Sequence, residues 1–190
     1  MCIRDRLYTD DSPELIKTAK DMKVPLAKAI PGRPSTNGVA ERAVRSVVEG
    51  ARTILEHAGL PARFWKYAVR HWCFSRNTSL RLGDSSWNLR FGQGHFTGPK
   101  FPFGCLVDFM PTPEYGRRAT VLPKFGPKAI PGVFLGYFLQ PGGRHRGDYL
   151  VASLKDFQDM DLSSTGGNHV RVHHIKDVQL TTVDVQFPLK

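Results

Sequence analysis

The 190-residue sequence contains little cysteine, no long apolar run and comparatively few acidic residues. Its three cysteines, Cys2, Cys73 and Cys105, are widely separated, which excludes a disulfide framework and is typical of a reducing compartment. None of them belongs to a paired Cys-x-x-Cys motif, so the sequence predicts no zinc site. No run of about 18 apolar residues occurs, so it also predicts no transmembrane helix and no membrane partner.

Positive charge is what the sequence has in excess. Lys and Arg total 27 against 17 Asp and Glu, which makes the net charge +10 and the pI about 9.8. Such a basic chain favours an anionic partner, nucleic acid first, although the same charge can also serve solubility alone. Hydrophobic residues make up 41% of the chain, enough for the core of one domain or of two small ones.

The first six residues, Met1 to Arg6, differ in character from the rest of the chain. They contain no apolar stretch and no small-residue cleavage site, which excludes a signal peptide. They resemble translated adapter sequence, and we interpret residues 1–6 as non-native. We therefore expect the natural chain to begin upstream and this sequence to be a fragment.

Apolar periodicity predicts a largely helical first part of the chain. The expected elements are a strand at 7–9, a helix at 12–22, an extended segment at 24–30, an irregular loop at 31–38, and helices at 41–58 and 61–76. The stripe of the first long helix holds Val44, Val47, Val48, Ala51, Ile54, Leu55 and Ala58, and that of the second holds Phe64, Trp65, Ala68, Val69, Trp72 and Cys73. Because Gly59 and Pro61 leave only a short connection, we expect an antiparallel helical hairpin.

The second part of the chain has the character of β structure. Residues 80–100 are poor in periodic apolar residues and are predicted to be a linker, with Trp87 and Phe91 packing against a neighbouring element. Strands are expected at 105–110, 132–137, 148–152 and 170–173, with a core of Leu106, Phe109, Val133, Leu135, Tyr149 and Val151. Short strands separated by Gly/Pro turns favour a small barrel, and the fold class as a whole is α+β.

Five short motifs follow one another along the chain. Residues 31–42 read PGRPSTNGVAER, residues 60–65 read LPARFW, residues 87–92 read WNLRFG, residues 103–105 read FGC, and residues 132–137 read GVFLGY. Together they resemble the pattern of retroviral-type integrases, most closely those of copia-type retrotransposons. The resemblance implies the C-terminal part of an RNase H-like catalytic core followed by an SH3-like barrel.

This resemblance implies a domain organisation, which we give as an expectation. Its parts are the non-native residues 1–6, the C-terminal part of the integrase core at 7–79, a linker at 80–100, the SH3-like barrel at 101–180 and a tail at 181–190.

The resemblance also assigns two carboxylates to catalysis. Asp10 matches the family's second catalytic acid, in the segment YTDDSPE, and Glu41 matches the third. In a displacement at phosphorus, two divalent cations about 4 Å apart stabilise the attacking and the leaving oxygen. Hard cations such as Mg²⁺ or Mn²⁺ prefer carboxylate oxygens as ligands. Both residues would be metal ligands, whereas the family's first Asp is not in this chain. Without the motif, Asp10 could cap a helix, and Glu41 could be a solvated charge paired with Arg45.

Basic and polar residues form two groups that the sequence predicts to bind DNA. The first surrounds the start of the long helix, where backbone N–H groups favour phosphate, and the second lies in the predicted barrel, interleaved with Tyr115, Phe125 and Tyr137. The predicted DNA-binding residues are Arg33, Ser35, Thr36, Asn37, Arg42, Arg45, Arg117, Arg118, Lys124, Lys128, Arg144 and Arg146. A simple turn at Asn37 and Gly38, and a solvated loop in the barrel, are the alternatives.

The histidines near the C-terminal end do not have metal-site spacing. His169, His173 and His174 have no cysteine or carboxylate at the distances along the chain that metal sites use, so we interpret them as a solvated strand end.

The sequence therefore predicts DNA integration as the process to which the chain contributes. The resemblance implies metal-dependent end processing and strand transfer by the complete protein, DNA as partner, self-association, and an intracellular, nuclear place of action. The chain alone is expected to lack activity. The alternative is a non-enzymatic basic module, a helical hairpin with a barrel, that binds nucleic acid or a protein.

Overall fold

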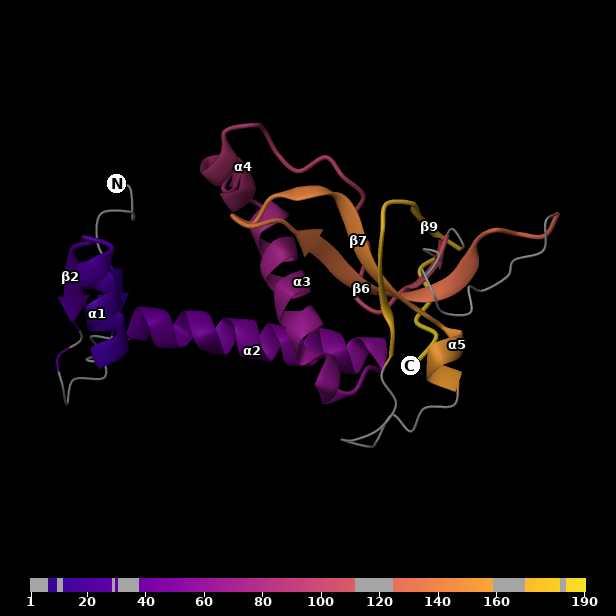
Figure 1. The fold of residues 1–190 in the computed structure, drawn as a ribbon, viewed down its shortest axis with the longest axis horizontal. Helices are drawn as coiled ribbons and strands as arrows, with labels where there is room; N and C mark the ends of the chain where they lie inside the picture. Colours follow the sequence, from indigo (N-terminus) through magenta and orange to yellow (C-terminus); the bar gives the residue numbers. More distant parts are fainter. Residues whose placement is uncertain are drawn as a thin grey trace. The chain divides into compact units, whose positions relative to one another are not determined.

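The computed structural model describes residues 7–9, 12–28, 30, 38–111, 125–158, 170–181 and 184–190. It contains both helices and strands, with an antiparallel sheet as its largest β element, as the predicted α+β class requires (Figure 1). The chain divides into two compact units, unit 1 at residues 1–46 and unit 2 at residues 47–190. Within the described residues no helix is long and apolar enough to cross a membrane.

Unit 1 contains a small β-α-β arrangement. Strand β1 (Leu7–Thr9) pairs in parallel with β2 (Leu26–Lys28), and helix α1 (Pro13–Asp21) connects them. Parallel strands need such a crossover because a tight turn would reverse the chain. Pro13 stands in the first turn of α1, where its missing N–H costs no helical hydrogen bond. The strand, helix and extended segment predicted for residues 7–30 are thus confirmed.

Helix α2 (Gly38–Ala58) is the longest helix of the described chain and runs through the division between the two units. It ends where the sequence predicts, because Gly59 adopts a positive φ of 67° that a side chain would disfavour. The amide of Leu60 then donates to the carbonyl of Leu55 at 3.0 Å, which is the hydrogen bond that defines a Schellman motif at the C-terminus of a helix.

Helix α3 (Trp65–Thr78), preceded by the 3-10 turn η3 (Ala62–Phe64), corrects two predictions. The helix packs against the sheet strand β6 and rises steeply from α2 instead of running back along it, so the predicted antiparallel hairpin is wrong (Figure 1). Its buried face carries Ala68, His71 and Phe74, whereas Trp65 is 62% exposed. The buried face of α3 therefore differs from the predicted apolar face. The reason is that periodicity in an aromatic-rich helix does not show which face meets the sheet.

Ordered structure occupies part of the predicted linker. A two-stranded hairpin of β3 (Leu80–Arg81) and β4 (Asp84–Ser85) leads into helix α4 (Ser86–Phe91). The Ser85 hydroxyl accepts a hydrogen bond from the Asn88 amide at 3.1 Å and caps α4. Trp87 on α4 contacts Phe74 of α3 with ring centroids 5.7 Å apart, as its apolar character predicted.

Five antiparallel strands form the main sheet, in the order β8-β7-β6-β5-β9. They are β5 (Leu106–Phe109), β6 (Ile130–Leu139), β7 (His145–Ser153), β8 (Val172–Ile175) and β9 (Val178–Leu180), with the short helix α5 (Lys155–Gln158) after β7. The four strands that the sequence predicts correspond to β5 to β8, whereas β9 was not predicted.

The connection between β8 and β9 shows that this sheet is rolled up. The two strands lie at opposite edges, yet only residues 176 and 177 separate them in the chain. Three residue steps span at most about 11 Å, whereas the edges of a flat five-stranded sheet lie about 19 Å apart. The edges must therefore approach each other. Register shifts in the β6–β7 pair, next to Gly136 and Leu139, favour such bending.

Two hydrophobic clusters cover the two faces of the sheet. The first joins α2, α3 and the sheet through Leu55, Ala68, Val133 and Leu135, together with other residues. The second lies on the opposite face, since Phe134 belongs to it and alternate side chains of a strand point in opposite directions. This explains why Gly132 to Tyr137 are all buried.

The predicted core residues divide between these clusters. Val133 and Leu135 face the helices, Phe109, Tyr149 and Val151 lie in the second cluster, and Leu106 is only half-buried. One close contact between helix and sheet depends on Gly104, whose φ is 78° and whose added Cβ would lie 2.3 Å from the Cβ of Ala58.

Candidate nucleic-acid interface

The predicted catalytic pair is only partly within the described residues. Glu41 lies in the first turn of α2 with its side chain exposed, whereas Asp10 lies outside the described residues. An acidic residue in the first turn is favourable electrostatically, since the positive end of the helix dipole lies there. The exposed side chain of Glu41 is also compatible with the alternative of a solvated helix charge, although no ion pair joins it to Arg45.

A metal centre is not formed by the described part of the chain alone. Among the described residues, no three His, Cys, Asp or Glu side chains come close enough to hold an ion. One exposed carboxylate does not fit Mg²⁺ or Mn²⁺, which are held by several oxygen ligands. A site that includes Glu41 would need further oxygen ligands.

The first predicted DNA-binding group surrounds the N-terminus of α2. Its members Arg42 and Arg45 are exposed on the first two turns, and Arg42 Nε donates to the Gly38 carbonyl at 3.1 Å. The four residues predicted before the helix, Arg33, Ser35, Thr36 and Asn37, lie outside the described residues. What the structure supplies here is the start of a long helix with exposed guanidinium groups.

The second predicted group is divided in the same way. Lys128 before β6, Arg144 in the β6–β7 turn and Arg146 on β7 are all exposed. Arg117, Arg118 and Lys124 lie outside the described residues, as does the aromatic Tyr115.

Two aromatic residues predicted to interleave with these basic side chains differ in their surroundings. Phe125 is 96% exposed. Tyr137, by contrast, is buried, and its hydroxyl accepts from the Phe101 amide at 2.9 Å and donates to the Pro99 carbonyl at 3.1 Å. Burial raises the pKa of Tyr137 to about 12. Tyr137 therefore belongs to the core, and its predicted place in a DNA groove is wrong.

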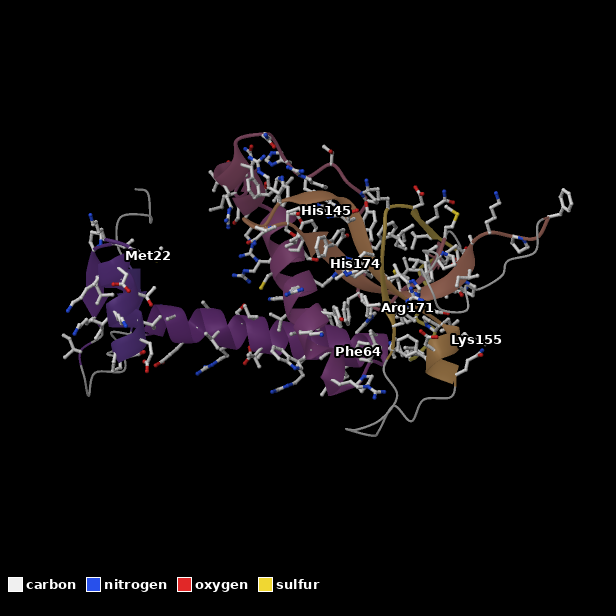
Figure 2. The ribbon with its side chains drawn as sticks, in the orientation of Figure 1. Met22, Phe64, His145, Lys155, Arg171 and His174 are labelled. Carbon is white, nitrogen blue, oxygen red and sulfur yellow. The ribbon has the colours of Figure 1, made fainter. Side chains whose placement is uncertain are left out.

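The histidines lie in contrasting environments. His173 is buried and His174 exposed, because side chains alternate between the two faces along β8, so the predicted solvated strand end is wrong for His173. His169 lies outside the described residues. His145 is half-buried beside Phe74 and Tyr137, and burial lowers its pKa (Figure 2). His71 was missed by the sequence analysis, although its spacing from Ala68 and Phe74 places all three on one helix face.

A further cavity lies at the end of the sheet next to α5. It has a volume of about 580 Å³ and is lined by polar groups of both charges, among them Lys155, Asp156 and Arg171 (Figure 2). No pattern in the sequence points to this cavity, because its lining residues are far apart in the chain and follow no motif.

Comparison with known proteins gives a consistent similarity. The chain resembles part of retrotransposon Pol polyproteins. It is 35% identical over 117 residues, 58% of its length, to the retrovirus-related Pol polyprotein from transposon TNT 1-94 of Nicotiana tabacum. It is 33% identical over 116 residues, 57% of its length, to that from transposon RE1 of Arabidopsis thaliana.

The matched region is a small part of each relative. It spans 8% of the Nicotiana polyprotein and 7% of the Arabidopsis one. No family model matches the chain.

Proposed function

We propose that this chain is the integrase region of a copia-type retrotransposon polyprotein, that it binds DNA, and that it serves retrotransposition. In this proposal unit 1 and the neighbouring helices derive from the C-terminal part of an RNase H-like core, and the rolled five-stranded sheet is the SH3-like domain. The DNA would be the ends of the element and its target.

The observation that carries the proposal is the motif at the start of α2. The letters NGVAER at residues 37–42 resemble the integrase signature, and the helix begins at Gly38 with Glu41 in its first turn. A catalytic carboxylate on a rigid helix is held more steadily than one on a loop. The parallel β1–β2 pair with its crossover helix adds support, because parallel pairing is typical of α/β cores.

Electrostatics supports DNA as the partner. The net charge of +10 and the exposed arginines Arg42, Arg45, Arg144 and Arg146 would serve contacts to phosphates, which do not depend on base sequence. In the complete protein, Asp10 and Glu41 would hold Mg²⁺ or Mn²⁺ together with a further carboxylate. A non-enzymatic module that binds nucleic acid remains the second candidate, favoured by the lack of a three-ligand cluster among the described residues.

The experiment is a titration of a labelled duplex with the 190-residue chain at several salt concentrations. We expect affinity to fall steeply between about 50 and 200 mM salt, because phosphate contacts release condensed counterions. Replacing both Arg42 and Arg45 by Gln should reduce the salt slope by about two, since each lost phosphate contact lowers it by about one.

The matched control is Arg52→Gln, which removes an exposed charge from the same helix outside the predicted site. It should leave the salt slope nearly unchanged. Absence of duplex binding, or binding that does not respond to salt, would overturn the proposal.

A further inference from the structure

A small aromatic cavity opens between α3, α4 and the turn joining β6 to β7. Its volume is about 230 Å³, below the range of about 300–1,000 Å³ that holds a drug-sized ligand. Rings of Phe74, Trp87 and Phe91 form its apolar wall, and the exposed side chains of Asn77 and Ser86 supply polar groups. The space suits a single flat ring system.

The aromatic wall is held in place by packing. Phe74 is buried in the second hydrophobic cluster, and its ring centroid lies 5.7 Å from that of Trp87 in an edge-to-face arrangement. Trp87 in turn meets Phe91 at 4.6 Å. Since Trp87 and Phe91 are only half-buried, part of each ring stays available to a ligand. A preorganised aromatic surface binds a flat group with little loss of side-chain entropy.

Two arginines converge on the same ring from different elements. The guanidinium carbons of Arg90 on α4 and Arg144 in the β6–β7 turn lie 5.5 and 5.3 Å from the centroid of Phe91. Both side chains are exposed, and neither forms an ion pair with a carboxylate of the described chain. Two positive charges disfavour a cationic ligand such as a methylated lysine. They favour an anion that also carries a flat apolar group.

We infer that this cavity binds one unpaired nucleotide of a single nucleic-acid strand. The base would lie against the Trp87 and Phe91 rings with its polar edge toward Asn77 and Ser86, and the flanking phosphates would contact Arg90 and Arg144. Stacking on aromatic side chains accommodates every base, so the site selects an unpaired strand and not a sequence. The inference takes nucleic acid as the partner from the proposed function. It adds a binding site for an unpaired base, which binding of a duplex does not need.

The test compares single-stranded and duplex probes on the full 190-residue chain. The probes are a short DNA strand carrying a fluorescent base analogue, its duplex, and an RNA strand of the same sequence. Phe91→Leu keeps an apolar side chain but removes the ring, and it should weaken single-strand binding about tenfold, as loss of one stacking partner requires. Duplex binding should remain unchanged. Comparing the affinities of the DNA strand and the RNA strand shows whether the cavity prefers DNA, RNA or neither.

Arg144→Gln and Arg146→Gln form the matched pair for the charge. Each removes one exposed arginine near the start of β7, but only Arg144 lies over Phe91. We expect Arg144→Gln to weaken single-strand binding severalfold more than Arg146→Gln. The change in base fluorescence at saturation should persist in Arg144→Gln and be reduced in Phe91→Leu, which removes the stacking ring. Thermal melts of all variants establish that each still folds.

The outcomes separate this inference from the proposed function. If duplex binding persists and both Phe91→Leu and Arg144→Gln behave like Arg146→Gln on the single strand, the cavity assignment is wrong and the proposed function stands. If the single strand binds through the cavity while the duplex does not bind, the cavity assignment stands and the proposed function is wrong. Binding of an acidic aromatic peptide, lost in Arg90→Gln, with no oligonucleotide binding, would overturn the inference in favour of a protein partner.

Discussion

At the scale of single residues, the fold changes the acid–base chemistry of His71. It lies on the buried face of α3, stacked on Tyr137 at 5.7 Å and close to Phe103 at 5.5 Å. Its Nδ1 atom is buried with no hydrogen-bond partner in the structure. Burial lowers the pKa of His71 from 6.5 to about 4, because the apolar surroundings disfavour the imidazolium ion.

This lowered pKa predicts a loss of stability on acidification. Between pH 6.5 and about 4 the unfolded chain binds a proton at His71 that the folded chain does not. The free energy of unfolding should therefore decrease as the pH is lowered from 6.5 to about 4, by up to about 1.4 kcal/mol per pH unit. Below the pKa of the folded state it should level off. Urea denaturation at several pH values measures it.

His71→Phe should remove this contribution while keeping an aromatic ring in the core. The exposed His174, replaced by Gln, is the matched control for the loss of one histidine. An unchanged slope in His71→Phe would contradict the prediction.

At the scale of elements, the close approach of α2 and α3 depends on a glycine. A Cβ on Gly50 would lie 2.2 Å from the indole of Trp72, a ring held between the two helices. Glycine is a poor helix former, so its presence in the middle of α2 is explained by this contact and not by local preference.

Gly50→Ala should therefore destabilise the protein although alanine favours helix. We expect a loss of about 1–3 kcal/mol, because the added methyl group would force Trp72 or the helices to shift. Gly38→Ala is the control on the same helix, since nothing lies within 4 Å of the added Cβ there. Chemical denaturation of both variants makes the comparison, and equal stability of the two would show that the indole moves freely.

At the scale of the whole molecule, burial is concentrated in unit 2. The described residues of unit 1 include only Thr9 and Ala19 as buried residues, whereas unit 2 holds both hydrophobic clusters. Helix α3 packs against β6 and contributes Ala68 to the first cluster and Phe74 to the second, so α3 and β6 should resist opening together.

Hydrogen exchange is expected to show this contrast. Backbone amides of α3 and of β6 should exchange slowly and at similar rates, because both open only with the clusters they share. Amides of α1 and β2 should exchange much faster. Similar protection throughout the chain would contradict the prediction, as would fast exchange in α3 with slow exchange in β6.

Strand transfer is a property that we expect the 190-residue chain to lack when tested alone. The proposed mechanism needs carboxylates for two metal ions, and the motifs of this chain supply only Asp10 and Glu41. An oligonucleotide-joining assay with Mg²⁺ or Mn²⁺ checks this, with Glu41→Gln as the companion variant. Metal-dependent joining that disappears in Glu41→Gln would overturn the expectation.

Local signals in the chain were sufficient to locate most of the elements. Helix α2, its end at Gly59 and the strands β5 to β8 were predicted, because apolar periodicity and turn residues act over a few positions. The hairpin of β3 and β4, helix α4 and strand β9 were not predicted, since such short elements leave little periodicity. The proposed catalytic role of Glu41 and the proposed domain boundaries remain predictions.

Long-range packing decided the remainder. Whether Trp65 or His71 faced the core, and whether α3 lay along α2 or on β6, depended on the shape and apolar area of the sheet, which no stretch of α3 encodes. In the same way, Arg90 and Arg144 are 54 positions apart and share no motif, yet the rolled sheet and α4 bring both onto Phe91. Side-chain periodicity is a property of one element, whereas a site is a property of the distances between elements.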